Sequence, residues 1–295
     1  MTRALADALA KLHQGGPQLA ASQFTPAQRR ALDEFARRTS AVRKAQKGRG
    51  IVYEVLRSEA LRLELERLYP GALKPAAVDL PNRARNLANR RSSKASGHGH
   101  EHRYLLLKAI STDCTWHSAR KGTLPLGETC AIAGAGVIAT TPEDDWQTSQ
   151  PIWLVENQAL FDRIDWLPAQ ARGSLLYYSG TLSESFLNWL ARRARAPILY
   201  YFADYDGAGL LNYVKLLEAS TVPVEFWLMP DWSDLLERYG NAAVWQQTQT
   251  QYKAACERLR RGQLRWPQEV GELVTALNLQ GLALEHEAVW LHQVE

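Results

Sequence analysis

Three short apolar runs between residues 151 and 209 decide the fold, and each ends in a polar turn. They are PIWLVENQ (151–158), SLLYYSG (174–180) and PILYYFADYDGAG (197–209). Helical stretches follow each run, and a fourth apolar run, VPVEFWLM, occupies residues 222–229. Strands that are apolar on both faces and alternate with helices are typical of βαβ units around a buried parallel sheet. The sequence therefore predicts an α/β domain with a parallel sheet over residues 146–295.

Acidic residues directly follow two of these strands. Glu156 closes the first run, and Asp204 and Asp206 follow the third in DYDGAG. Ligands bind at the carboxyl ends of strands in an open α/β sheet, so neighbouring strands would bring these carboxylates together. Clustered carboxylates repel one another without a cation, and Mg²⁺ and Mn²⁺ prefer oxygen ligands. These residues predict a site for one or two such ions. The simpler interpretation, a helix cap, fits Asp206 best.

Glycines stand beside both parts of this predicted site. Gly207 and Gly209 allow a tight turn into the next helix, and Gly180 would let backbone or DNA come close to the site. The alternative for Gly180 is a plain turn between a strand and a helix. Thr181 and Glu184 fit a capping box, so we expect Glu184 to be structural.

The order of these motifs resembles that of Toprim domains, which carry a glutamate after the first strand, a glycine after the second and a DxD motif after the third. Glu156, Gly180 and the pair Asp204 and Asp206 occur in that order. The resemblance covers roughly residues 150–230 and implies a Toprim domain with a Rossmann-like parallel sheet in the C-terminal part. Such domains occur in topoisomerases, primases and nucleases.

Within that superfamily, the chain resembles the nuclease subunit of Wadjet plasmid-defence systems, which is related to topoisomerase VI A subunits and cuts DNA without a tyrosine nucleophile. That family has a basic N-terminal region and a late glutamate pair, which Glu285 and Glu287 in LEHE could match. The resemblance implies a Mg²⁺- or Mn²⁺-dependent DNA endonuclease with Glu156, Asp204 and Asp206 as catalytic residues. It also implies a homodimer that acts with the SMC-like ATPase and kleisin subunits of a condensin-like complex.

Hydrolysis by this family fits the chemistry of the residues. A metal ion stabilises the charge that develops at the phosphate and lowers the pKa of a bound water. Glu156 is expected to be a metal ligand or the base that orients the water, and Glu285 or Glu287 would complete a second metal site. His286, between those glutamates, could assist the site, although a surface position is an equal alternative.

The first half of the chain is basic and the second half is acidic. Residues 1–150 hold 23 Lys and Arg against 14 Asp and Glu, whereas residues 151–295 hold 12 against 17. Helical spacing predicts a mainly helical DNA-binding region over residues 1–145, with a winged-helix-like form as one option, and residues 142–150 are typical of a linker. The candidate phosphate contacts are Arg83, Arg85, Arg90, Arg91, Lys94 and Arg103. A solvated basic face is the alternative.

Composition narrows the class of protein. Of 295 residues, 46% are hydrophobic and 22% charged, as in soluble globular proteins, and no apolar run reaches the roughly 18–20 residues that span a bilayer. Cys114, Cys130 and Cys256 form no CxxC pair, so we expect no disulfide framework and no thiolate zinc site. We expect a cytoplasmic, nucleoid-associated protein.

Two other functions fit the same motifs. One is tyrosine-dependent DNA strand breakage like that of topoisomerase VI A, for which Tyr104, directly after HEHR (100–103), is the candidate nucleophile. The other is a DNA-binding Toprim subunit without catalytic activity. No GxxxxGK[ST] motif occurs in the sequence, so any ATP-driven movement of DNA would depend on a partner.

Overall fold

The computed structural model describes residues 2–71, 79–94, 102–180 and 182–293. Contacts divide the chain into two compact units, Met1–His100 and Glu101–Glu295. The sequence analysis placed the boundary at residue 145. The observed boundary lies earlier because two strands between residues 103 and 140 belong to the large sheet of the second unit.

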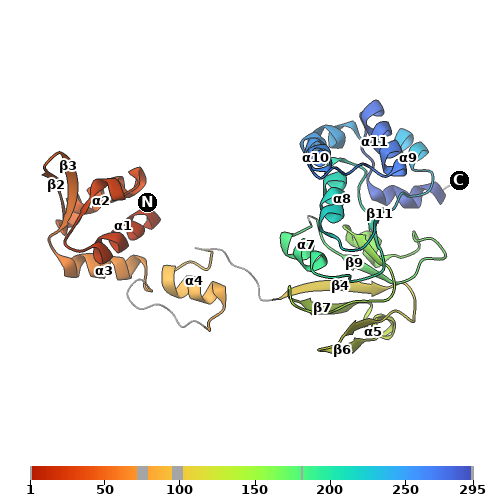
Figure 1. Cartoon of the computed structure of the whole chain (residues 1–295), viewed down its shortest axis with the longest axis horizontal. Helices are drawn as coiled ribbons and strands as arrows, with labels where there is room; N and C mark the ends of the chain where they lie inside the picture. The colour runs from red at the N-terminus through yellow and green to blue at the C-terminus, as the bar shows by residue number, and fades with distance from the viewer. Residues whose placement is uncertain (1, 72–78, 95–101, 181, 294–295) are drawn as a thin grey trace. The chain divides into compact units, whose positions relative to one another are not determined.

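The first unit combines helices with a small antiparallel sheet of strand order β1-β3-β2 (Figure 1). Helix α2 (Pro26–Thr39) begins at a capping box that Thr25 and Gln28 form, and proline suits the first helical position. It leads into a hairpin of β2 (Val42–Lys47) and β3 (Gly50–Val55). The other elements are α1 (Thr2–Gly15), β1 (Gln18–Ala20), the 3₁₀ helix η1 (Ala21–Gln23), α3 (Ser58–Leu68) and α4 (Asn82–Arg90).

Amphipathic helices give this unit its own core. Its buried side chains include Leu9, Leu12, Phe24, Leu32, Phe35, Tyr53, Leu61 and Leu65. The polar helix faces carry many cations, and the unit holds 19 Lys and Arg against 8 Asp and Glu, whereas the second unit holds 16 against 23. The expectation of a basic, mainly helical N-terminal region is compatible with this unit, to which the structure adds a three-stranded sheet.

The second unit is an α/β structure built on a mixed sheet of strand order β11-β10-β8-β9-β4-β7 (Figure 1). The strands are β4 (Arg103–Ala109), β7 (Gly136–Thr140), β8 (Ile152–Val155), β9 (Ser174–Tyr177), β10 (Leu199–Phe202) and β11 (Val224–Phe226). Strands β8 to β11 are parallel, as expected, but β4 is antiparallel to both of its neighbours. The parallel sheet predicted for residues 146–295 is therefore confirmed, but the whole sheet is mixed, because it includes two antiparallel strands before residue 145.

Helices cover this sheet, and a small hairpin extends from it. The helices are α5 (Leu126–Ala133), α6 (Gln158–Asp162), α7 (Glu184–Ala191), α8 (Gly207–Ala219), α9 (Trp232–Tyr239), α10 (Ala242–Arg261), α11 (Gln268–Gln280) and the 3₁₀ helix η2 (His286–Gln293). The hairpin joins β5 (Trp116–Ser118) to β6 (Gly122–Leu124). None of the helices in the described ranges is long and apolar enough to cross a bilayer.

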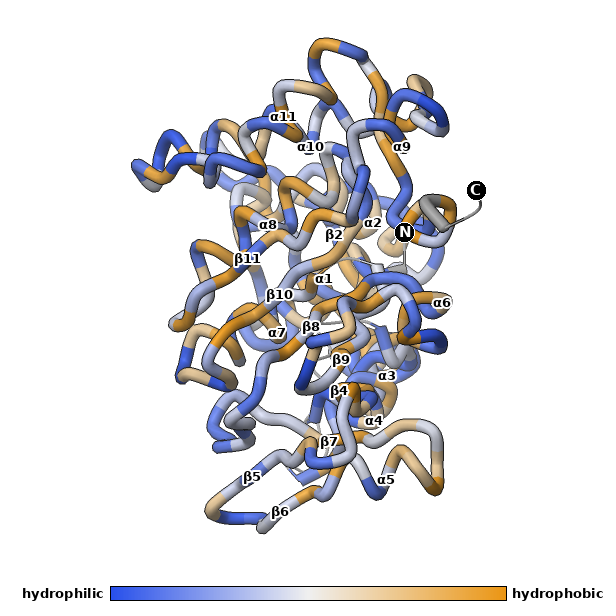
Figure 2. Tube along the Cα trace, turned by 90° about the vertical axis from the view of Figure 1, so that its right-hand side faces the viewer, coloured by the Kyte–Doolittle hydropathy of each residue, from blue (hydrophilic) through white to orange (hydrophobic). Residues whose placement is uncertain are grey.

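Aromatic packing fixes the two central strands relative to each other. All four residues of β8 are buried, and Figure 2 shows hydrophobic segments along the strands of the large sheet. Trp153 of β8 pairs with Tyr200 of β10, and their ring centroids lie 4.3 Å apart. The next residue of β10, Tyr201, points to the other face and stacks on Tyr213 of α8 at 6.2 Å. The carboxyl ends of β8 and β10 are thereby held in a defined position.

The connections between parallel strands leave in opposite directions at these carboxyl ends. Strand β8 leads through α6 to β9 on one side, and β9 leads through α7 to β10 on the other side of β8. Right-handed crossovers therefore place α6 on one face of the sheet and α7 and α8 on the opposite face. The contact between α7 and α8 agrees with this arrangement. Ligands of α/β sheets bind at such a switch point.

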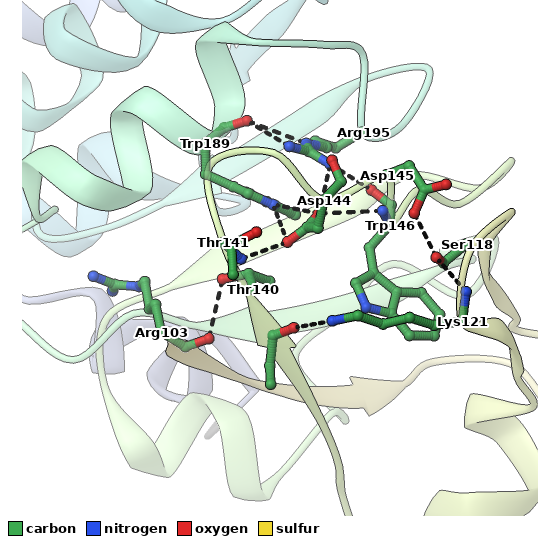
Figure 3. Close-up of polar contacts among 11 residues, drawn as sticks. Arg103, Ser118, Lys121, Thr140, Thr141, Asp144, Asp145, Trp146, Trp189 and Arg195 are labelled. Atoms are coloured by element: carbon green, nitrogen blue, oxygen red, sulfur yellow. Dashed lines mark hydrogen bonds and ion pairs between the residues drawn. The ribbon is translucent and has the colours of Figure 1, made fainter. Parts of the chain in front are cut away.

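A buried ion pair anchors the segment before β8 (Figure 3). The side chains of Asp144 and Arg195 lie 2.9 Å apart and are 3% and 0% exposed. Arg195 also donates hydrogen bonds to the carbonyl oxygens of Trp189 and Trp146, and the Trp189 indole donates to Asp144. The linker prediction for residues 142–150 is wrong, because this network ties the segment to the end of α7.

Candidate metal centre

Glu156 and Asp204 follow neighbouring strands at this switch point. Val155 pairs with Phe202 in the parallel register of β8 and β10, so both acids lie just beyond the last pair. Burial, followed by the charge of Asp204, raises the pKa of Glu156 above its usual 4.5. The structure thus places these two predicted site residues at one edge of the sheet.

The C-terminal segment returns to the same edge. Tyr205 and Leu284 exchange backbone hydrogen bonds of 2.8 and 3.1 Å, which form an isolated antiparallel bridge. The residues that follow this bridge begin η2. His286 and Glu287 therefore reach Asp204, although His286 is 82 positions away from it in the chain.

His286 contacts Asp204 through both its backbone and its side chain. The backbone amide donates to Oδ1 of Asp204 at 2.9 Å, and Nδ1 lies in ion-pair contact with the same oxygen. Burial lowers the pKa of His286, but the contact with Asp204 and the charges of Glu287 and Glu156 outweigh it, so this pKa is raised above 6.5. Burial raises the pKa of Asp204, but His286 outweighs burial and holds it below 3.8. Asp204 is therefore ionised at neutral pH.

Three side chains offer ligand atoms that all lie within 4.8 Å of one another: Asp204, His286 and Glu287. The His286 side chain is only 2% exposed, and its Nε2 atom makes no hydrogen bond of standard geometry with a described residue. Buried polar atoms normally have a partner, because leaving one unsatisfied costs about 1–3 kcal/mol. One imidazole and two carboxylates form a donor set that suits Mn²⁺ and related divalent ions. The residues present therefore fit a metal ion.

Asp206 is held as a helix cap. Its carboxylate accepts a hydrogen bond of 2.7 Å from the amide of Gly209, at the first turn of α8. Burial, to which the charge of Asp204 adds, raises the pKa of Asp206 to about 6 despite this bond. The capping interpretation is confirmed for Asp206. Its raised pKa also indicates that a cation at this edge would stabilise the ionised form.

Neighbouring side chains orient the two glutamates. The Tyr178 hydroxyl lies 3.2 Å from Oε2 of Glu156 and can donate a hydrogen bond to it. Glu287 accepts a hydrogen bond from the amide of Asn157, the residue that caps α6. Glu285 is exposed and is not one of the three clustered residues. Of the two late glutamates, only Glu287 is therefore close to Asp204.

Close backbone approaches explain two of the predicted glycines. A Cβ atom on Gly207 would lie 1.9 Å from the carbonyl oxygen of Thr248 in α10, and one on Gly209 would lie 2.1 Å from that of Asp204. Gly180 has a φ of +76° and no heavy atom within 4 Å of such a Cβ. Gly180 is thus required by its backbone conformation rather than by crowding.

Helix α7 begins at Ser183. The Ser183 hydroxyl accepts a hydrogen bond of 3.2 Å from the amide of Phe186, so Ser183 takes the capping position that the sequence analysis gave to Thr181. Thr181 itself lies outside the described residues. The same hydroxyl accepts a hydrogen bond from Nη1 of Arg103. Arg103 belongs to the second unit, whereas the other five candidate phosphate contacts belong to the first.

A groove of about 480 Å³ in the first unit is lined largely by basic side chains. These are Arg3, Arg67, Arg90, Arg91 and Lys94. The Arg90 guanidinium lies over the ring of Tyr69, 5.5 Å from its centroid. Arg83 is exposed on α4, and Arg85 donates a hydrogen bond of 3.0 Å to the carbonyl oxygen of Leu80. Three of the candidate phosphate contacts thus face one concave, positively charged surface.

Two residues of the site were missed by sequence reasoning, and one was left open. Asn157 and Tyr178 were not considered. Asn157 directly follows Glu156, and Tyr178 directly follows the last residue of β9. The alternative of a surface position for His286 is wrong, because the folded chain buries it beside Phe202. The available signal was the sequence LEHE, in which an apolar residue and two acids flank this histidine.

A family model described as Domain of unknown function (DUF7281) matches residues 105–295. The match begins inside β4 and covers every residue of the candidate metal centre. No curated protein matches the chain.

Proposed function

We propose that this chain, which belongs to the family described as Domain of unknown function (DUF7281), is a metal-dependent DNA endonuclease of the Toprim type. One observation carries the proposal: Asp204, His286 and Glu287 converge at the carboxyl ends of β8 and β10. Glu156 and Asp206 add two carboxylates there. Phosphodiester hydrolysis requires stabilisation of the charge that develops on the phosphate, and such a cluster can hold the cation that provides it.

Each residue has a proposed role. Asp204, His286 and Glu287 would hold one Mg²⁺ or Mn²⁺ ion, and Asp206 would contribute further negative charge or a ligand for a second ion. When bound, the ion stabilises charge on the phosphate and lowers the pKa of the attacking water. Glu156 is the proposed proton acceptor, because its raised pKa brings it closer to the pH at which a general base works well. Tyr178 orients it.

The proposed substrate is double-stranded DNA, held in part by the basic first unit. The resemblance to the nuclease subunit of Wadjet systems supports a role in plasmid defence, with a homodimer acting beside an SMC-like ATPase and kleisin subunits. This role would place the protein in the cytoplasm, associated with the nucleoid. The charge asymmetry supports the same division of labour, because cations of the first unit suit phosphates and acids of the second suit a metal.

Cleavage of supercoiled plasmid tests the proposal. The purified chain is incubated with plasmid and Mg²⁺, Mn²⁺ or EDTA, alone and with its condensin-like partners and ATP. We expect nicked or linear product that needs metal and is lost in Asp204→Asn and Glu156→Gln. The matched control is Glu237→Gln, an exposed acid of α9, which should cleave like the wild type. Equal activity in Asp204→Asn, or intact plasmid in every condition with partners present, would contradict the proposal.

Tyrosine-dependent strand breakage is the second candidate, and one observation favours it. Tyr104 is 69% exposed, and the antiparallel register of β4 and β9 places it at the same edge of the sheet as Glu156. This mechanism predicts a covalent adduct between protein and DNA that survives denaturation and disappears in Tyr104→Phe. Cleavage by Tyr104→Phe at the wild-type rate, without an adduct, excludes it. A DNA-binding subunit without catalysis predicts full binding and full activity of the assembled system in Asp204→Asn.

A further inference from the structure

Arg103 lies at the edge of the sheet that carries the candidate metal centre. Leu106 of β4 is opposite Tyr177 of β9, which is in turn opposite Val155 of β8. Because β4 runs antiparallel, Arg103 extends beyond the carboxyl end of β9, on the same side as Glu156. Neighbouring strands lie about 4.8 Å apart, and β9 separates β4 from β8, so β4 and β8 run roughly 10 Å apart.

The side chain of Arg103 also points towards the face that α7 covers. Its guanidinium lies over the ring of Phe186, 5.3 Å from the centroid, and Nη1 contacts the hydroxyls of Ser183 and Ser185. Figure 3 shows this side chain pointing away from the buried network around Asp144. Helix α8, which Asp206 caps, contacts α7 on this face. The guanidinium therefore shares both an edge and a face of the sheet with part of the metal centre.

The positive charge of Arg103 has no counter-ion among the described residues. Burial is the cause that lowers the pKa of Arg103 below its usual value, and no acid acts against it. Its Nε atom is buried and lacks a hydrogen-bond partner in the described ranges. A partly buried cation with an unsatisfied donor is costly unless an anion meets it. The surroundings of Arg103 therefore favour an anionic ligand.

We propose that Arg103, Ser183 and Ser185 bind one backbone phosphate of the DNA strand that enters the metal centre. This inference rests on the proposed function. A guanidinium can pair with a phosphate through two parallel hydrogen bonds, and the pair of serine hydroxyls, hydrogen-bonded to each other at 2.9 Å, keeps one proton free to donate. Arg103 and Glu156 lie at the same edge of the sheet, so one strand of DNA can contact both residues. Arg103 would thus set the register of the strand relative to Glu156.

DNA affinity tests this site independently of cleavage. The full chain in the Asp204→Asn background is titrated with a labelled duplex in EDTA, over a range of salt concentrations. Arg103→Met keeps the apolar stem on Phe186 but removes the charge, and should raise Kd about tenfold and reduce the salt slope by about one. Arg103→Lys should restore most of the slope. The matched control is Arg120→Met, which removes an exposed cation between β5 and β6.

Thermal unfolding separates binding from a structural role. Arg103→Met should unfold no earlier than its parent, because it removes a partly buried charge. An unchanged Kd and salt slope, a loss of stability with unchanged Kd, or an equal effect of Arg120→Met would each overturn the phosphate site. Arg103-dependent DNA binding by a wild-type chain that never cleaves DNA would overturn the proposed endonuclease and leave the phosphate site standing.

Discussion

The backbone amide of His286 donates a hydrogen bond of 2.9 Å to Oδ1 of Asp204, across 82 positions of the chain. This bond joins the C-terminal segment to the carboxyl end of β10. The donor set of the candidate metal centre is therefore completed by the last residues of the chain rather than by the sheet alone. Changes in that segment should alter metal binding while leaving the sheet intact.

His286 should decide which metal binds best. An imidazole ligand favours Mn²⁺ over Mg²⁺, because Mg²⁺ strongly prefers oxygen. At about a hundredfold its Kd, a ligand adds about 2.7 kcal/mol of stability, which corresponds to roughly 5–10 °C in Tm for a unit of this size. We expect Mn²⁺ to raise the Tm of the wild type by this amount in scanning fluorimetry. His286→Gln should lose most of that shift, while a variant of exposed His117, His117→Gln, should keep it.

The pKa of Asp206 predicts a pH dependence in the absence of metal. Burial raises this pKa from 3.8 to about 6, so the folded chain is destabilised when Asp206 is ionised, above pH 6. This rise in pKa corresponds to a loss of roughly 3 kcal/mol in the free energy of unfolding when Asp206 is ionised. In EDTA at pH 8, Asp206→Asn should therefore unfold later than the wild type, because asparagine also caps helices well. The advantage should shrink as the pH falls through 6 and vanish below about 3.8.

Urea unfolding of both proteins across this pH range measures the effect. A less stable Asp206→Asn at pH 8, or an advantage that grows as the pH falls, would show that the carboxylate is not destabilised by burial. Saturating Mn²⁺ should reverse the order at pH 8, because the ionised wild type gains more from a cation than the neutral variant does.

The buried ion pair of Asp144 and Arg195 should stabilise the fold far more than the exposed ion pair of Glu143 and Arg192. Asp144→Asn leaves the charge of Arg195 uncompensated in the core and should cost about 3–5 kcal/mol. Glu143→Gln breaks a solvent-exposed pair with Arg192 and should cost less than about 1 kcal/mol. Chemical unfolding of the two variants is a direct comparison, and similar losses would contradict the assigned role of Asp144.

The basic groove of the first unit should contribute to DNA affinity without sequence preference. Reversing two of its exposed cations, as in Arg91→Glu with Lys94→Glu, should weaken binding to unrelated duplexes by similar factors. If each residue contacts one phosphate, the salt slope should fall by about two. Anisotropy titrations at several salt concentrations measure this, and an unchanged slope would place the DNA elsewhere on the chain.

The parallel strands and their acidic ends were predictable from local sequence. Strands β8, β9 and β10 are short, apolar on both faces and separated by helical stretches, and Glu156 and Asp204 follow them directly. Strands β4 and β7 were not assigned to this sheet, because their antiparallel pairing depends on contacts rather than on local periodicity. The predicted boundary at residue 145 therefore separates β4 and β7 from the other strands of the same sheet.

Long-range placement limited the prediction of the site. His286 reaches Asp204 only through the bridge between Tyr205 and Leu284, which no local pattern encodes. Glu285 and Glu287 could not be told apart from sequence, since their different exposure follows from the direction of η2. Helix caps, in contrast, could be predicted from the sequence, because a cap joins residues only three positions apart, as Asp206 and Gly209 do.

Binding of Mn²⁺ tests the central claim, that Asp204, His286 and Glu287 hold a divalent ion at the end of the sheet. Electron paramagnetic resonance of free Mn²⁺ during a titration gives the number of bound ions and their affinity. We expect one or two ions per wild-type chain. Asp204→Asn should lose at least the roughly tenfold affinity that removal of even an outer partner costs a metal site, and Glu237→Gln should match the wild type. No bound Mn²⁺ in the wild type, or identical titrations of wild type and Asp204→Asn, would contradict the account.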